Sequence, residues 1–362
     1  MSPARSMPAY LKIILMSLMA AGFLFGFLDI VIPLNFERLH VFLFNMTVGG
    51  FVILHYTRGE GRPSAGLLLY LALGAVYAVL AFFNRYGIAL AAAVPMWAIV
   101  EKTRTGRFSF FPKNFFRNDA PVERKFHEAA LLCLSLSFVF STVVVMNTEF
   151  FHWFTLDKLK PDVFFLGFSF PVSLITMSVM FRYIGPDRPA LHRLIENGIF
   201  WTINIGVIIF FVFIIFGLFA AEVAAASVLF VAVIFLFVYF LKYGAGLKQK
   251  HFLISGMVFL LFTAFTGLLY IPAKAMGMTP LPELLLKSHA YISLYGWNLS
   301  GLFVITRRED FPFGMNSWKM ILLHWTVIML APAGKYVPAA VPFICAAFIV
   351  LLYRYFFARE KD

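Results

Sequence analysis

The sequence predicts an all-α polytopic membrane protein, with about twelve transmembrane helices in one bundle. Three observations predict this fold class. The chain is 61% hydrophobic, only 13% of its residues are charged, and its mean hydropathy is +0.85. Apolar runs recur at lengths near the roughly 20 residues that a helix needs to cross a bilayer. No run alternates polar and apolar residues as the strands of a membrane barrel do.

The apolar runs follow one another from end to end, so residues 1–362 are expected to form a single transmembrane domain. The longest loop, 102–125, is too short to bury a core of its own. Two boundaries depend on one residue each, Arg85 and Glu222, so ten or eleven spans are also compatible with the sequence. The expected spans are 9–34, 38–57, 65–83, 85–101, 126–148, 162–184, 197–219, 220–241, 251–272, 284–305, 317–335 and 336–357.

Basic residues predict the orientation of the bundle. With the N-terminus inside, all but seven of the 30 Lys and Arg residues lie on the cytoplasmic side. This bias is typical of cytoplasmic loops, so both termini are expected in the cytoplasm, in the inner (cytoplasmic) membrane of a bacterium. The 102–125 loop is the most basic segment. We interpret its charge as attraction to anionic lipid headgroups, and we expect no nucleic-acid partner.

Three histidines lie within apolar runs, where an ionisable side chain is costly and suggests a functional site. His40 and His289 stand near the starts of two runs that both cross from outside to inside, so both imidazoles should lie near the outer face. Two such rings could hold a b-type haem between helices, with Arg38 and Lys287 near its propionates. Each could instead hydrogen-bond to a neighbouring helix. His324 should lie deeper, as a second metal ligand, a proton-transfer group or a packing residue.

The segment from His289 to Asn298, with Tyr291, Gly296 and Trp297, carries a family resemblance. It resembles the histidine helix of cytochrome cbb-type haem-copper oxidases, in which His-x-His is followed at this offset by Gly-Trp-Asn. His289-Ala290 and His40 also resemble the corresponding helices of the NnrS family of haem- and copper-holding membrane proteins. The resemblance implies a haem near His289, and it places Tyr291 and Trp297 among the cofactor-binding candidates.

The chain also departs from the oxidase pattern. Tyr291 replaces the second His of His-x-His, and the runs 162–184 and 197–219 contain no histidine for a three-His copper site. Copper is therefore not supported by the sequence, and neither is full oxygen reduction.

A haem protein for electron transfer, or for binding a small gas such as NO or O2, is the main functional hypothesis. A redox partner or quinol would then be expected, and any enzyme activity would be that of an oxidoreductase. The alternative is a cofactor-free twelve-helix transporter or permease. Asn45 and Asn298 match the pattern of glycosylation acceptors, but both lie in spans and carry no such meaning. The sequence leaves the oligomeric state open.

Overall fold

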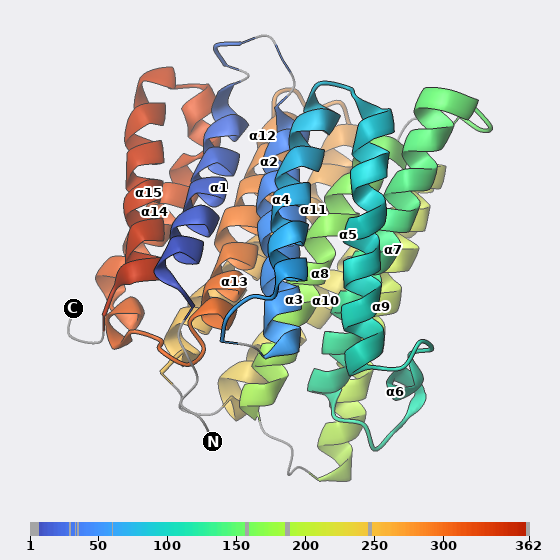
Figure 1. Ribbon diagram of the computed structural model, residues 1–362, viewed down its shortest axis with the longest axis vertical. Coiled ribbons are helices and arrows are strands. Elements are labelled where there is room, and N and C mark those ends of the chain that lie inside the picture. Colours follow the sequence, from blue (N-terminus) through green and yellow to red (C-terminus); the bar gives the residue numbers. More distant parts are fainter. Residues whose placement is uncertain are drawn as a thin grey trace.

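The computed structural model describes residues 7–28, 30–32, 34, 36–59, 61–155, 159–184, 189–244 and 248–359. Long, roughly parallel helices account for most of these residues, and none of the described residues forms a strand (Figure 1). The helices are α1 (Ala9–Leu28), α2 (Glu37–Val41), α3 (Gly50–Arg58), α4 (Ala65–Phe82), α5 (Tyr86–Arg107), α6 (Lys113–Phe116), α7 (Val122–Met146), α8 (Leu159–Ile184), α9 (Ala190–Phe216), α10 (Phe219–Tyr243), α11 (Lys250–Ala275), α12 (Leu281–Tyr291), α13 (Leu299–Thr306), α14 (Trp318–Leu330) and α15 (Val341–Phe357).

Two of the rods are continuous helices with a π-helical middle. The segment η1 (Phe42–Gly49) joins α2 to α3, and the segment η3 (Ile292–Asn298) joins α12 to α13. We call these rods helix 37–58 and helix 281–306. A shorter π-helical turn, η2 (Asn147–Phe151), extends α7. The short 3₁₀ turns η4 (Phe313–Asn316), η5 (Pro332–Lys335) and η6 (Pro338–Ala340) flank α14 and precede α15.

Nine helices among the described residues are long and apolar enough to cross a membrane. The all-helical, membrane-embedded prediction is confirmed at this level. Three rods on which spans were expected do not qualify, for different reasons. α14 has only 13 residues, α5 carries Glu101 and Lys102 near its end, and helix 281–306 contains many polar residues.

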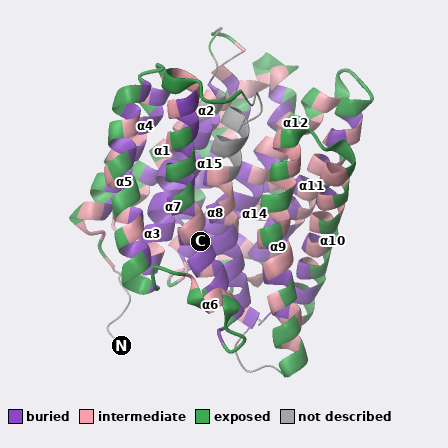
Figure 2. Cartoon of the chain, turned by 90° about the vertical axis from the view of Figure 1, so that its right-hand side faces the viewer, coloured by how far each residue is buried: buried purple, intermediate pink, exposed green. Residues whose placement is uncertain are grey.

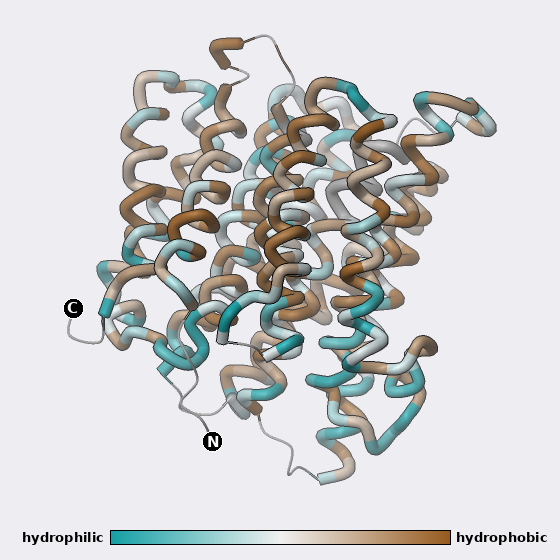
Figure 3. Tube along the Cα trace, in the orientation of Figure 1, coloured by the Kyte–Doolittle hydropathy of each residue, from teal (hydrophilic) through white to brown (hydrophobic). Residues whose placement is uncertain are grey.

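Several expected boundaries differ in the structure, for example the end of α1 at Leu28, and two of the differences concern the turn at Glu222 and the basic loop. The turn before α10 lies at Gly217, whose positive φ of 66° ends α9, so Glu222 stands inside the first turn of α10. Glycine adopts this left-handed conformation without the steric cost that a side chain adds. The basic loop is also shorter than 102–125, because α5 continues to Arg107 and α7 begins at Val122. Hydrophilic residues gather at the end of the molecule that carries α6 (Figure 3).

Three rods form the centre of the bundle: helix 37–58, α8 and helix 281–306. Each contacts the other two. In the apolar windows of the first two rods, 89% and 67% of the residues are buried, against 17–56% in the other candidate spans. The purple, buried ribbon of Figure 2 follows these central elements. Each central rod follows one long helix of the outer layer, namely α1, α7 and α11, and packs against it.

Small residues allow the central rods to approach one another and the neighbouring α4 closely. A Cβ atom on Gly301 would collide with Thr176 of α8, and one on Gly50 would collide with the ring of Tyr70. Both glycines are helical, so what they provide is space for a neighbouring side chain. Close helix approach at small residues is a common packing device in membranes.

We predict that Gly301→Ala destabilises the bundle by about 1–3 kcal/mol, because the added methyl group overpacks the contact with Thr176. Reversible unfolding of the purified protein in mixed micelles measures this loss. Gly66→Ala is the matched control, since a Cβ atom there meets no heavy atom within 4 Å. Equal stabilities of the two variants would contradict the close packing of α13 against α8.

Candidate functional site

The imidazole ring of His289 packs against α11 and forms a hydrogen bond to its backbone. Its Nδ1 atom lies 2.9 Å from the carbonyl oxygen of Thr263, and Gly267 leaves the space that the ring occupies. A carbonyl oxygen only accepts, so Nδ1 must carry the proton and donate it. The lone pair of the neutral ring then resides on Nε2. Ligating histidines in metal and haem sites are commonly oriented by such a bond to the backbone.

His40 is 5% exposed and faces a group of aromatic rings. Its Nδ1 atom lies 3.2 Å from the hydroxyl oxygen of Tyr295, and its ring centroid is 6.4 Å from that of Tyr291. The opposite wall is Gly26 of α1, where a Cβ atom would come within 3.3 Å of Nδ1. Two tyrosines of helix 281–306, Tyr291 and Tyr295, therefore contact His40.

The structure places His40 and His289 at neighbouring levels but does not bring their rings together. Tyr291, which contacts His40, lies only two residues beyond His289, a rise of about 3 Å. Two residues are also a rotation of about 200° around a helix, so Tyr291 and His289 point to different sides. His289 contacts α11, whereas Tyr291 contacts α1 and His40.

His324 is 1% exposed, and both of its ring nitrogens have partners. Nε2 lies 2.7 Å from the carbonyl oxygen of Tyr295 and therefore donates to it. Nδ1 then accepts the hydroxyl proton of Tyr355 at 2.9 Å. Phe252 and Phe259 pack against the ring. In this arrangement no lone pair remains for a metal ion, which favours the interpretation of His324 as a packing residue.

The remaining cofactor-binding candidates separate in space. Lys287 forms an ion pair with Glu283 one turn away, at the same end as His289. The Tyr291 hydroxyl donates to the Gly26 carbonyl at 3.0 Å. Trp297 is fully buried about 12 Å deeper along the helix than His289, because eight residues separate the two. The side chain of Arg38 lies outside the described residues.

Trp297 belongs to a buried polar cluster that joins the three central rods, which we call the amide cluster. Asn298 donates to the side-chain oxygen of Asn45 at 3.2 Å, and Asn45 donates to Ser169 at 2.6 Å. Ser173 donates to Asn298 at 3.1 Å and accepts from the indole of Trp297 at 3.0 Å. Both asparagines are fully buried and stand in the π-helical segments η1 and η3.

Sequence reasoning missed the amide cluster, although both asparagines were visible in apolar runs. Polar side chains there usually hydrogen-bond across helices, and this was the available signal. Close by in η1, the buried Thr47 hydroxyl has no hydrogen-bond partner. π-Helical turns occur frequently at functional sites, so the cluster is a second candidate site beside His289.

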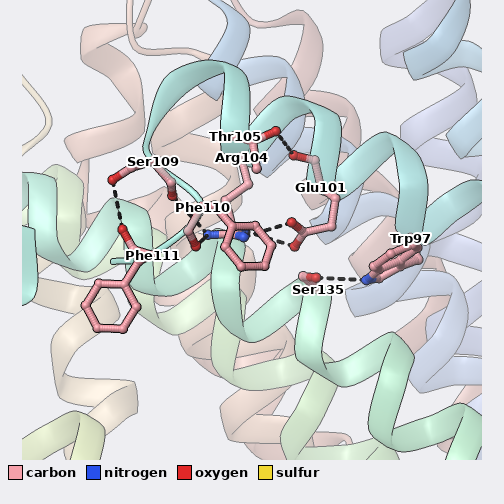
Figure 4. Close-up of polar contacts among 8 residues, drawn as sticks. All are labelled: Trp97, Glu101, Arg104, Thr105, Ser109, Phe110, Phe111 and Ser135. Carbon is pink, nitrogen blue, oxygen red and sulfur yellow. Dashed lines mark hydrogen bonds and ion pairs between the residues drawn. The ribbon is translucent and has the colours of Figure 1, made fainter. Parts of the chain in front are cut away.

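Two basic residues of the 102–125 segment are buried and bonded to other parts of the protein. Arg104, 2% exposed, pairs with Glu101 at 2.8 Å and donates to the carbonyl oxygens of Ser109 and Phe110 (Figure 4). Lys125, 1% exposed, donates to the side chain of Asn197 at 2.6 Å. Arg104 and Lys125 therefore hold the folded segment in place by hydrogen bonds, and their charges do not face lipid headgroups.

Comparisons of the chain with protein-family models, with curated proteins and with solved structures find no match. The likeness of residues 289–298 to oxidase and NnrS helices thus stands on those residues alone. Within the described part of the chain, no three His, Cys, Asp or Glu side chains gather closely enough to hold a metal ion. A haem needs only one or two protein ligands, so this finding does not bear on it.

We predict that Asn45→Leu costs about 1–3 kcal/mol of stability, since it leaves polar atoms of Asn298 and Ser169 without partners in the core. Unfolding in mixed micelles, with Asn298→Leu and the double variant, measures the coupling. The double variant should lose less than the sum of the single losses. Asn204→Leu is the control, because Asn204 donates only to Phe200 of its own helix. Additive losses would contradict a shared cluster.

Proposed function

We propose that all twelve rods cross the inner membrane of a bacterium and that both termini lie in the cytoplasm. The distribution of Lys and Arg residues supports this orientation. The three rods outside the nine apolar candidates lie within the same bundle, where polar side chains such as Arg104, His324 and Asn298 are buried. A polar helix is tolerated in a membrane when it is buried among others.

We propose further that the protein binds a b-type haem with His289 as its protein ligand. The observation that carries this proposal is the Nδ1–H bond from His289 to the Thr263 carbonyl, which leaves Nε2 as the nitrogen able to bind iron. His289 is half-buried, and Lys287, which pairs with Glu283, lies two residues before it near the same end of the helix. Lys274, at the end of α11, is a second cation for the propionates.

The same geometry favours gas binding over electron transfer. Electron-transfer haems of the two-histidine type need a second imidazole facing the first, and the His40 ring is instead placed against Tyr291 and Tyr295. If a haem were bound, His289 would be its one protein ligand in this arrangement, and the group would supply the chemistry for binding NO or O2. The hydroxyl of Tyr291 is itself engaged, because it donates to the Gly26 carbonyl.

The amide cluster favours a second candidate, a cofactor-free permease. Hydrogen-bonding groups from three central rods meet there at π-helical segments, deep in the bundle. A small polar solute could exchange hydrogen bonds with these side chains. In that case the histidines would be packing residues, and the purified protein would be colourless.

We predict that the segments flanking α5 and α14 lie on opposite sides of the membrane. In a background with Cys133 and Cys345 replaced by Ala, Phe83→Cys and Tyr336→Cys should react with an impermeant maleimide in intact spheroplasts. Phe110→Cys and Phe313→Cys should react only after permeabilisation. All four residues are exposed. If both members of either pair react from the same side, the helix between them does not cross.

We predict a b-type haem band in the reduced-minus-oxidised spectrum of protein purified from haem-replete cells, and its loss in His289→Ala. His40→Phe should keep the band, because His40 is not a ligand in this arrangement. His251→Ala is the control for removing an exposed histidine. Addition of NO to the reduced protein should shift the band. A colourless protein would overturn the haem proposal and favour the permease.

A further inference from the structure

A cavity of about 1080 Å³ opens at the end of the bundle where α1 begins and α15 ends. Its walls come from these two ends, from Lys248 and Gln249 just before α11 and from residues 307–311 after α13. None of the histidines and none of the amide cluster lines it. In the proposed orientation it faces the cytoplasm at the level of the lipid headgroups.

Hydrogen bonds and ion pairs hold the charged side chains of the cavity wall in place. Arg307 is 4% exposed, and its guanidinium donates to the carbonyl oxygens of Tyr355 at 2.8 Å and of Ala358 at 2.9 Å. The same group pairs with Asp310 at 2.8 Å. The Lys12 ammonium lies 3.7 Å from the other carboxylate oxygen of Asp310. One acid is therefore shared by two fixed cations.

Where the structure describes the lining, basic side chains outnumber acidic ones. The second acid, Glu309, pairs with Arg308 at 3.0 Å, so both carboxylates face cations of the same wall. A net positive, partly buried site favours an anion with several acceptor oxygens, such as a phosphate ester. Among the described residues, the basic lining residues are Lys12, Lys248, Arg307, Arg308 and Arg359, and the acids are Glu309 and Asp310; Lys248 and Arg359 also have further partners.

Another part of the lining is apolar and aromatic. Tyr353, Phe356 and Phe357 of α15 and Phe311 form this part, with Met7 beside them. Tyr353 is 56% exposed on the outside of the bundle, where lipid chains would lie. Inorganic phosphate would fill only a small part of 1080 Å³ and would gain nothing from these rings. A ligand with a phosphate and an attached apolar chain matches both halves of the lining.

We propose that this cavity binds the phosphate headgroup of an anionic phospholipid, with its glycerol and upper acyl chain against α15. Basic pockets between transmembrane helices on the cytoplasmic side are known to hold anionic headgroups. The proposal does not depend on a haem. It depends on the membrane location of the protein, and a reversed orientation would change only the leaflet from which the lipid comes.

The test measures lipid binding by native mass spectrometry of the detergent-purified full chain. Phosphatidylglycerol, phosphatidylcholine and inorganic phosphate are titrated separately. We expect phosphatidylglycerol to bind at one saturable site and phosphatidylcholine to bind at least about tenfold more weakly. The double variant Lys12→Gln/Lys248→Gln should weaken phosphatidylglycerol binding by at least about tenfold. Arg307 is left unchanged because it holds the end of α15.

Lys319→Gln, which removes an exposed charge outside the cavity, is the matched control and should bind like the wild-type protein. Thermal unfolding of each variant without lipid shows whether it is folded. Equal affinity for the two lipids, or equal loss in Lys319→Gln, would overturn the site. Competition by inorganic phosphate at the affinity of the lipid would assign the cavity to a free phosphate instead.

Discussion

The hydrogen bond between Asn298 and Asn45 is the contact on which the centre of the protein depends. It joins helix 37–58 to helix 281–306, and the serines of α8 bind both asparagines at the same level. Apolar side chains gain little by leaving lipid for one another, so packing and a few polar contacts must set which helices meet. The amide cluster fixes the depth at which the three central rods cross, and the outer helices pack around that core.

This core also explains the placement of the histidines. Once helix 281–306 is fixed by Asn298, its first half presents His289 to α11 and its two tyrosines to α1 and His40. The Tyr295 carbonyl accepts from His324 on the other side. Three histidines that look equivalent in the sequence therefore have different partners: a backbone carbonyl, a phenol, and both a carbonyl and a phenol.

The apolar runs predicted most of the fold, because hydrophobic length is read directly from the residues. Helix ends were harder to predict. Gly217 ends α9 through its backbone conformation, and in the sequence this signal is weaker than the charge of Glu222.

The candidate site was only partly predictable. Depth follows from residue number, so the neighbouring levels of His40 and His289 could be derived. The direction of each ring depends on rotation about the helix axis, which the packing and the π-helical segments set. The amide cluster needs three rods that are distant in sequence.

The heavily buried central rods have a consequence for how the chain is made. Helix 37–58 and α8 are less apolar than the helices α1 and α7 that precede them, and helix 281–306 is too polar to qualify as a span by itself. Each of the three emerges from the ribosome directly after an apolar helix against which it packs in the finished protein. Insertion as helical hairpins would give every central rod a partner on entering the bilayer. The order of helices along the chain thus suits membrane insertion, because an apolar helix is synthesised directly before each of the three more polar central rods.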